Sequence, residues 1–168
     1  GGINLSILEK IVEDVREDVN RAIRSEPLDG LEPSSFEKRS FIKSIKSQSS
    51  ISVVGELKRA SPSQGEIRSD FNVEELAKAL VNGGVAGISV LTEFNHFRGK
   101  LEYLEKVRRA VQVPILRKDF VVDEYQIYQA EKNGADAVLL IVDILGDSLP
   151  DFIDTAESLG LETLVEVR

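Results

Sequence analysis

Charged side chains occur at the ends of several short apolar runs in this sequence. Glu56 and Lys58 lie two residues apart at the end of one run, Lys118 ends a second, and Glu166 lies near the end of a third. Two carboxylates and two amines with apolar neighbours suit proton transfer, because burial and nearby charges move their pKa values toward neutrality. The four residues therefore predict acid–base chemistry if the fold gathers them. The alternative is that each one is only solvated or ion-paired.

Hydroxyl and aromatic residues follow the same runs. The loop 61–65, which begins at Ser61 and reads Ser-Pro-Ser-Gln-Gly, offers hydroxyls and backbone N–H groups to an anion, and an ordinary turn is the alternative. Phe97 and Phe120 either stack on an aromatic substrate or pack against a loop. His96 is given no role. The sequence holds neither a P-loop nor a G-x-G-x-x-G motif, which argues against the usual nucleotide sites.

Composition excludes several classes of function. A net charge of −8 without a clustered basic stripe argues against a nucleic-acid partner. Cysteine is absent and there is one histidine, so disulfides, a thiolate nucleophile and Cys- or His-cluster metal sites are excluded. The longest apolar runs, 137–142 among them, are far shorter than the ~20 residues that span a bilayer, and no signal peptide opens the chain. We expect no membrane partner and a cytoplasmic location.

The first part of the chain predicts helices. Apolar residues at three- and four-residue steps indicate an amphipathic helix over 6–24, and Ser6 with Glu9 fits a capping box at its start. The segment 26–40 contains two prolines and predicts an irregular connection, and 41–47 predicts a short helix.

After residue 50 short apolar strands alternate with amphipathic helices. Strands are expected at 51–57, 87–92, 113–117, 137–142 and 162–167, and helices between them at 73–81, 100–111, 124–133 and 148–159. The strands do not alternate polar and apolar residues, which is typical of a parallel sheet covered on both faces. The chain thus divides into an N-terminal helical extension, 1–50, and a βα region, 51–168.

Two architectures fit this α/β pattern, an open doubly wound sheet and part of a closed (βα)8 barrel. A barrel typically needs ~250 residues, so length alone favours the open sheet. In either case ligands bind at the carboxyl ends of the parallel strands. Glu56, Lys58, Lys118 and Glu166 converge there on one pocket only if the sheet curls.

Five stretches, taken in order, carry a resemblance to a known family. They are E-L-K-R-A-S-P-S at 56–63, L-T-E at 91–93 with F-R-G at 97–99, P-I-L-R-K-D-F at 114–120, G-A-D-A-V-L-L-I at 134–141 and L-V-E-V at 164–167. Together they resemble indole-3-glycerol-phosphate synthase over about 50–168. The resemblance implies a TIM (βα)8 barrel, of which this chain carries strands 1 to 5, and so a partial barrel.

The activity that the resemblance implies closes an anthranilate ring onto a ribulose phosphate chain, with loss of CO2 and water, in tryptophan biosynthesis. No cofactor and no metal are implied. Lys118 would be the general acid that polarises the substrate carbonyl, and Glu166 the acid–base partner in the dehydration. Glu56 would be a supporting carboxylate, while Lys58 would meet the substrate carboxylate and help position Lys118.

The implied binding residues follow from the same resemblance. Ser61 would contribute to the phosphate site, and Phe97, Phe120 and Leu139 would form the apolar wall around the anthranilate ring. The expected partner is the phosphorylated anthranilate–ribulose substrate.

The sequence departs from the family at its end. The residues that the family draws from strands six to eight, with most of its phosphate site, do not occur in the 168 residues. We therefore expect a polypeptide of this length to be inactive alone, and to self-associate or bind a complementary C-terminal fragment through open barrel edges. The alternatives are another phosphosugar-binding barrel enzyme and a non-catalytic half-barrel assembly fragment.

Overall fold

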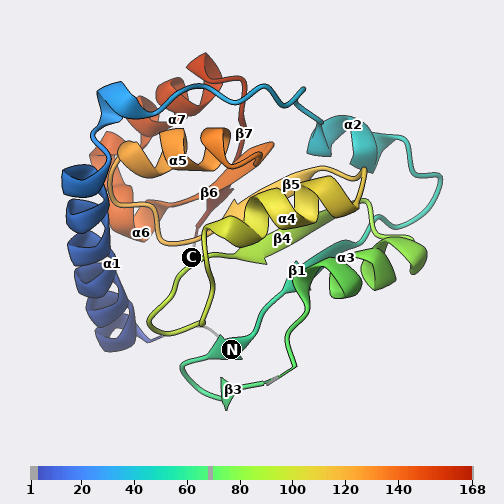
Figure 1. Ribbon diagram of the computed structural model, residues 1–168, viewed down its shortest axis with the longest axis horizontal. Coiled ribbons are helices and arrows are strands. Elements are labelled where there is room, and N and C mark those ends of the chain that lie inside the picture. Colours follow the sequence, from blue (N-terminus) through green and yellow to red (C-terminus); the bar gives the residue numbers. More distant parts are fainter. Residues whose placement is uncertain (1–3, 68–69, 168) are drawn as a thin grey trace.

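A five-stranded parallel sheet forms the centre of the computed structural model, which describes residues 4–67 and 70–167 (Figure 1). Its strands, in their order across the sheet, are β1 (Val54–Leu57), β4 (Gly87–Leu91), β5 (Ile115–Lys118), β6 (Ala137–Ile141) and β7 (Glu162–Glu166). Consecutive strands are neighbours throughout, whereas a doubly wound sheet reverses its strand order at a switch point. The preference for an open doubly wound sheet, drawn from length, is therefore wrong, and the arrangement is that of a partial TIM barrel.

Helices cover one face of this sheet. They are α3 (Val73–Asn82), α4 (Glu102–Ala110), α5 (Tyr125–Lys132) and α7 (Leu149–Ser158), with a short α6 (Val142–Leu145) and a 3-10 turn (Gly146–Ser148) before α7. Strand side chains such as Ile88, Val90, Val138 and Leu140 are fully buried against this layer. Figure 1 shows α4 lying along the sheet. The helices 73–81, 100–111, 124–133 and 148–159 were thus predicted to within two residues at each end, whereas α6 was missed.

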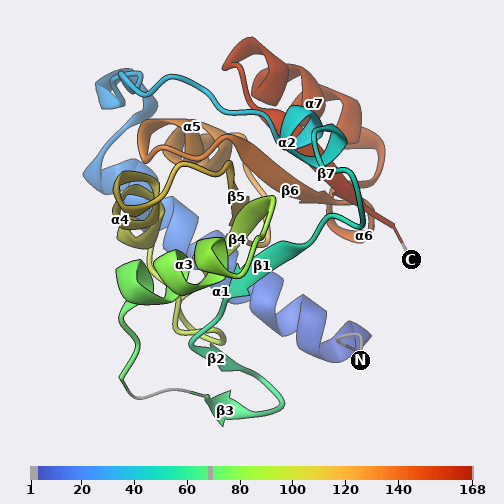
Figure 2. The same ribbon diagram turned by 90° about the vertical axis from the view of Figure 1, so that its right-hand side faces the viewer.

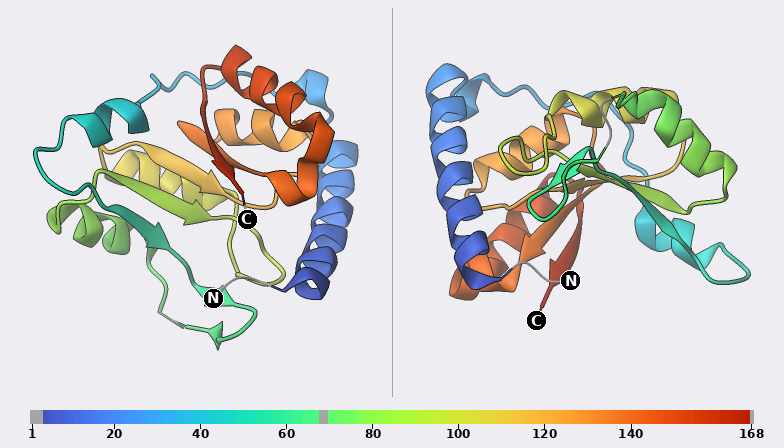
Figure 3. Two further views of the ribbon diagram at one scale, coloured as in Figure 1. Left: turned by 180° about the vertical axis from the view of Figure 1, so that it is seen from behind. Right: turned by 90° about the horizontal axis from the view of Figure 1, so that it is seen from below.

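The sheet is curved. In Figure 3 the strand β7 turns away from the surface that β1 and β4 share. Residue pairing fixes which side chains share a face, because paired residues of neighbouring strands point the same way and alternate residues of one strand point together. The pairs Glu56–Ser89, Ser89–Leu116, Leu116–Ala137 and Ala137–Glu162 link all five strands. Glu56, Lys118 and Glu166 therefore face the same concave side, opposite the helices.

The N-terminal helix α1 (Leu5–Ser25) begins one residue before the predicted range. Asn4, and not Ser6, is its N-cap, so the predicted capping box is wrong. The Asn4 side chain accepts a hydrogen bond from the Ile7 N–H at 3.0 Å, and the Ser6 hydroxyl donates to the same Asn4 oxygen at 2.7 Å. Asn caps a helix as well as Ser does, so the helix start shifts at little energetic cost.

Helix α1 covers the concave side at the carboxyl ends of the strands. It stands at the end towards which the strand arrows point (Figure 1). Leu8, Ile11, Val15 and Val19 form its buried stripe. They pack against five buried residues of the strand ends and loops, namely Leu91, Phe97, Phe120, Leu139 and Ile141, and we call this group the α1 cluster. Of the helices among the described residues, none is long and apolar enough to cross a membrane.

The segment after α1 runs to the opposite ends of the strands. It holds one 3-10 turn (Leu28–Gly30) and is otherwise irregular, as 26–40 predicted. Carboxylates of the barrel bind it: Glu131 accepts from the backbone and hydroxyl of Ser34 and from Lys38. The buried Asp136 accepts from the Arg39 N–H and from Arg108, both at 2.7 Å. These bonds fix an otherwise structureless connection onto the barrel.

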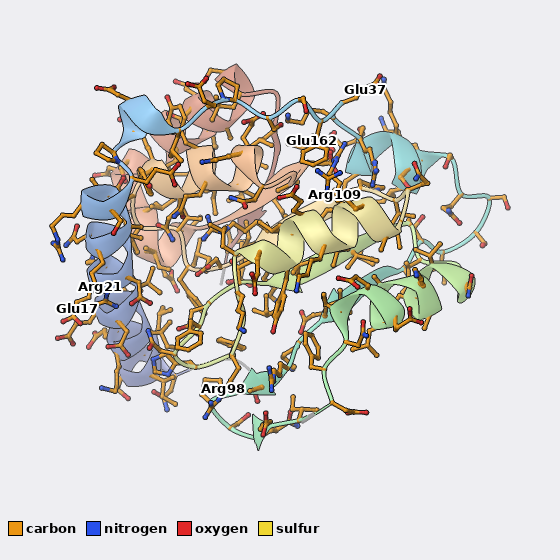
Figure 4. All side chains as sticks on the ribbon, viewed as in Figure 1. Glu17, Arg21, Glu37, Arg98, Arg109 and Glu162 are labelled. Atoms are coloured by element: carbon orange, nitrogen blue, oxygen red, sulfur yellow. The ribbon has the colours of Figure 1, made fainter. Side chains whose placement is uncertain are left out.

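Helix α2 (Phe41–Lys46), predicted as 41–47, closes the amino end of the concave side. Glu162, the first residue of β7, accepts hydrogen bonds from the Phe41 N–H at 2.6 Å and the Ser40 hydroxyl at 2.8 Å. Figure 4 shows Glu162 beside the start of this helix, and Figure 2 places α2 close to β7. A side chain at Gly87 would overlap the Phe41 ring, which explains glycine at the start of β4.

The α1 cluster supplies a first prediction. Replacing Ile11, which is fully buried, with alanine should lower the free energy of unfolding by about 2–4 kcal/mol, because a cavity remains beneath the helix. Ile7→Ala is the matched control, since Ile7 lies on the exposed side of the same helix. Urea unfolding measures both. Equal losses for the two variants would contradict the packing of α1 described above.

Candidate active site

Lys118, Glu56 and Lys58 form a charged cluster on the concave side. Lys118 Nζ lies 2.6 Å from Glu56 Oε2, and Lys58 Nζ lies 3.8 Å from Glu56 Oε1. The strands β1 and β5 are separated by β4, so the long side chains meet above it. The side chains of Lys118 and Glu56 are 37% and 35% exposed, which leaves both accessible to a ligand.

Glu166 lies on the same face but apart from this cluster. It ends β7, where it pairs in register with Ile141 of β6. Within the part of the chain that the structure describes, its side chain makes no hydrogen bond or ion pair, and it is exposed. The structure therefore brings Glu56, Lys58 and Lys118 together and leaves Glu166 across the concave side from them.

Ser61 lies in a small hairpin that the sequence reading missed. The two-residue strands β2 (Ala60–Ser61) and β3 (Gly65–Glu66) pair antiparallel. The Ser61 hydroxyl accepts a hydrogen bond from the Gln64 N–H at 3.2 Å, as in an ordinary turn. The Ala60 N–H donates to the Phe97 carbonyl at 3.2 Å, so the hairpin touches the loop after β4. Figure 4 shows Arg98, of that loop, beside the hairpin.

Phe97, Phe120 and Leu139 gather in the α1 cluster. The rings of Phe97 and Phe120 lie 5.8 Å apart between centroids and are tilted to each other. All three side chains are buried, and α1 packs against them. An apolar wall thus exists beside the Lys118 cluster, and α1 is its cover.

A second charged group, on the helix side of the sheet, was not foreseen. Arg117, between Leu116 and Lys118, is buried and lies 3.2 Å from Asp119 Oδ2. Its Nε donates to the Thr92 hydroxyl at 3.0 Å, and that hydroxyl donates to Asp119 at 2.6 Å. Burial lowers the pKa of Arg117, and the charge of Asp119 opposes that effect. The one signal in the sequence was an arginine within an otherwise apolar run.

Glu93 organises the loop after β4. Its buried carboxylate accepts from the N–H groups of His96 and Phe97, at 2.9 and 3.0 Å to Oε2. Burial raises its pKa above the ordinary 4.5, and the nearby Asp119 adds to this, while the two backbone bonds act in the opposite direction. His96 Nε2 lies 2.8 Å from Asp14 Oδ2 of α1. The loop that carries Phe97 is therefore fixed by its own residue Glu93 and by the contact of His96 with Asp14 of α1.

A cavity beneath α1 lies apart from the lysine cluster. It has a volume of about 210 Å³ and lies between α1 and the ends of β4 and β5, where Arg117, Asp119 and Gln126 line it. The Lys118 cluster is instead open on the concave side. Within the described residues, 4–67 and 70–167, no group of three or more His, Asp or Glu side chains could hold a metal ion.

The arrangement on the concave side can bind anions and transfer protons. Two ammonium groups flank one carboxylate, and an aromatic wall lies next to them. In a parallel βα barrel this is the edge at which catalytic groups from several strands meet. The fold and the cluster together define part of a (βα)8-barrel protein with a charged cluster at the carboxyl ends of its strands.

The comparisons with known proteins identify which barrel family this is. The family model described as indole-3-glycerol phosphate synthase matches residues 8–168. Proteins named indole-3-glycerol phosphate synthase from Caldanaerobacter subterraneus subsp. tengcongensis and Legionella pneumophila (strain Paris) are 45% and 44% identical to this chain. Both similarities cover 96% of this chain. The chain belongs to the indole-3-glycerol phosphate synthase family.

The chain spans 63% of the length of these two relatives. A relative with the same name from Neisseria meningitidis serogroup C is 44% identical, with 96% of this chain and 65% of the relative covered. The similarity therefore extends through the concave cluster and the α1 cluster, and the relatives contain further sequence beyond it.

The raised pKa of Glu93 predicts a dependence of stability on pH. The folded state keeps the Glu93 proton to a higher pH than the unfolded state, whose ordinary value is 4.5. The contribution of Glu93 to the free energy of unfolding therefore falls as pH rises from about 4.5 through the raised folded value, and is then constant. Glu93→Gln should gain stability relative to the wild type across that window, measured by urea unfolding at a series of pH values. A stability difference that does not change with pH would contradict this.

Proposed function

We propose that this chain carries part of the active site of an indole-3-glycerol-phosphate synthase. The substrate would be 1-(2-carboxyphenylamino)-1-deoxyribulose 5-phosphate, which loses CO2 and water as the indole ring closes. The observation that carries the proposal is the 2.6 Å pair of Lys118 and Glu56 beside the apolar wall of Phe97, Phe120 and Leu139, in a chain of this family.

Lys118 would supply the first proton. Ring closure forms a bond between the ring carbon that bears the carboxylate and the carbonyl carbon of the sugar chain. The carbonyl oxygen then takes a proton from the Lys118 ammonium, and CO2 leaves to restore the aromatic ring. Glu56 orients the Lys118 side chain before this step through their 2.6 Å contact. Lys58, on the far oxygen of Glu56, would meet the substrate carboxylate.

The dehydration would use Glu166. The hydroxyl formed in the first step leaves as water, and a carboxyl group that gives and takes protons lowers the barrier. Glu166 faces the concave side from β7, with no partner among the described residues to hold it, so it is available for this role. Ser61, in the hairpin that follows the carboxyl end of β1, would contribute to the phosphate site.

Catalysis is tested in a chimera in which the residues after position 168 come from the Caldanaerobacter relative. Lys118→Gln should lower kcat 10²- to 10⁴-fold, as expected for the loss of a general acid, while the chimera itself turns over. Formation of indole-glycerol phosphate is followed by its fluorescence. Lys43→Gln, on the exposed side of α2, is the matched control and should leave kcat unchanged. A chimera without turnover, or a fully active Lys118→Gln, would contradict the proposed function.

A polypeptide of these 168 residues should itself be inactive and should associate. Among the described residues β1 pairs only with β4, and β7 only with β6, so both outer strands present free backbone groups. The concave side also exposes apolar side chains of these strands, such as Val54 and Leu164. Such a surface would bind a second copy of the chain, or a C-terminal fragment that supplies the remaining strands.

Size exclusion at micromolar concentrations should show species larger than a monomer. Leu164→Lys should reduce this association, because it places a charge on the concave side of β7, where Leu164 is 54% exposed. Leu28→Lys is the matched control: Leu28 is 43% exposed but lies on the N-terminal connection. A sharply monomeric wild-type chain, or equal effects of the two variants, would contradict the proposed association.

A further inference from the structure

The residues on either side of Lys118 point away from it, into a buried network on the helix side of the sheet. We propose that Arg117 is a positioning residue for the candidate active site: its guanidinium binds β4, α5 and the loop after β5 together, and so fixes Lys118 and Phe120. This inference rests on the proposed function, because it assigns Arg117 a task in that reaction. Nothing in the family comparison assigns a role to this residue.

The guanidinium of Arg117 contacts three parts of the fold. Its Nη1 donates to the Gln126 carbonyl at 2.7 Å and to Gln129 Oε1 at 3.1 Å, both on α5. Its Nε reaches Thr92 at the end of β4, and its Nη2 reaches Asp119 in the loop after β5. These directions need the planar fork of an arginine, which a lysine ammonium does not reproduce.

The partners of Arg117 then hold the loop backbone itself. Asp119 Oδ1 accepts from the Phe120 N–H at 2.7 Å. Gln126, almost fully buried, accepts from the N–H groups of Val122 and Asp123 at 2.7 and 3.1 Å, and donates to the Phe120 carbonyl at 3.2 Å. Both polar groups of the Phe120 backbone are thus bound by the side chains of Asp119 and Gln126. Arg117 contacts the first residue through its carboxylate and the second through its backbone carbonyl.

Because side chains alternate along the strand, the network beneath the sheet also sets the positions of Lys118 and Phe120 on the concave side. Arg117 and Asp119 point to the helices, so Lys118 between them, and Phe120 after them, point to the concave side. The Lys118 carbonyl also accepts from the Thr92 N–H at 3.1 Å. A shift of the loop would therefore move the Lys118 ammonium relative to Glu56 and the Phe120 ring relative to Phe97.

The charges of the network lie next to Lys118 in the chain but on the other face of β5. A loosened loop should leave the binding groups on β1 in place and misplace Lys118 and Phe120. A displacement of about 1 Å at a reacting group can lower turnover ~10²-fold. The expected signature is thus a loss in kcat with little change in KM.

Arg117→Lys in the chimera described above tests this. We expect kcat to fall at least 10-fold, with KM within about threefold of the unchanged chimera. The matched control is Arg108→Lys. Arg108 is an equally buried arginine, 4% exposed against 6% for the side chain of Arg117, and it pairs with the buried Asp136. It lies at the amino ends of the strands, so its replacement should lower stability and leave kcat within about threefold. Both are assayed well below their melting temperatures.

Hydrogen exchange in the 168-residue chain provides a readout that does not depend on activity. In Arg117→Lys the amides of Phe120, Val122 and Asp123, which donate hydrogen bonds to Asp119 and Gln126, should exchange at least 10-fold faster. In Arg108→Lys these amides should keep their wild-type rates.

The outcomes separate the two proposals. If the chimera turns over, equal kcat values for Arg117→Lys and Arg108→Lys overturn the role of Arg117 and leave the proposed function intact. If the chimera does not turn over, the proposed function fails, and the exchange rates decide whether Arg117 fixes the loop. Unchanged exchange at Phe120 in Arg117→Lys overturns the positioning role in either case.

Discussion

The alternation of side chains along five parallel strands is the constraint on which the rest of the structure depends. Residues such as Val90, Val138 and Leu140 face the helices and build the main core, while their neighbours in sequence face the concave side. Because the strands are in sequential order and curve together, a shift of one residue in register decides whether a charged side chain faces the concave side or the core. Lys118 and Glu56 lie on the concave side, where water reaches them, so their charges remain hydrated.

Arg117 and Asp119 are the exception, since alternation forces them into the layer beneath the helices. An unpaired buried charge would cost several kcal/mol, so the network of Thr92 and Gln126 must satisfy both. A hydrophobic residue at 117 would fit the core more simply. The same network binds the loop backbone at Phe120, which gives a reason for charge at this point. Stability alone does not require a buried charge at position 117.

Much of this fold could be predicted from the sequence because its signals are local. Apolar runs and helical spacing gave the strands and helices to within a few residues, and the charged strand ends indicated the edge of the sheet at which Glu56 and Lys118 meet. Length alone favoured an open sheet, which is wrong, whereas the partial barrel expected from the family resemblance is confirmed by the strand order. The position of α1 over Phe97 and Phe120 could not be predicted from the sequence either. A helical pattern shows which face of a helix is apolar, but not what that face packs against.

The N-terminal segment holds the five curved strands at both of their ends. Helix α1 covers the carboxyl ends through the α1 cluster, and α2 binds the amino end of β7 through Glu162. Between them, Asp136 and Glu131 hold the connecting chain against the loops. One continuous segment therefore contacts both ends of the barrel strands and links the first residue of β7 to β4 through Ser44 and Gly87. Within residues 4–67 and 70–167, the curvature of the five strands is thus supported from both of their ends as well as by the hydrogen bonds between them.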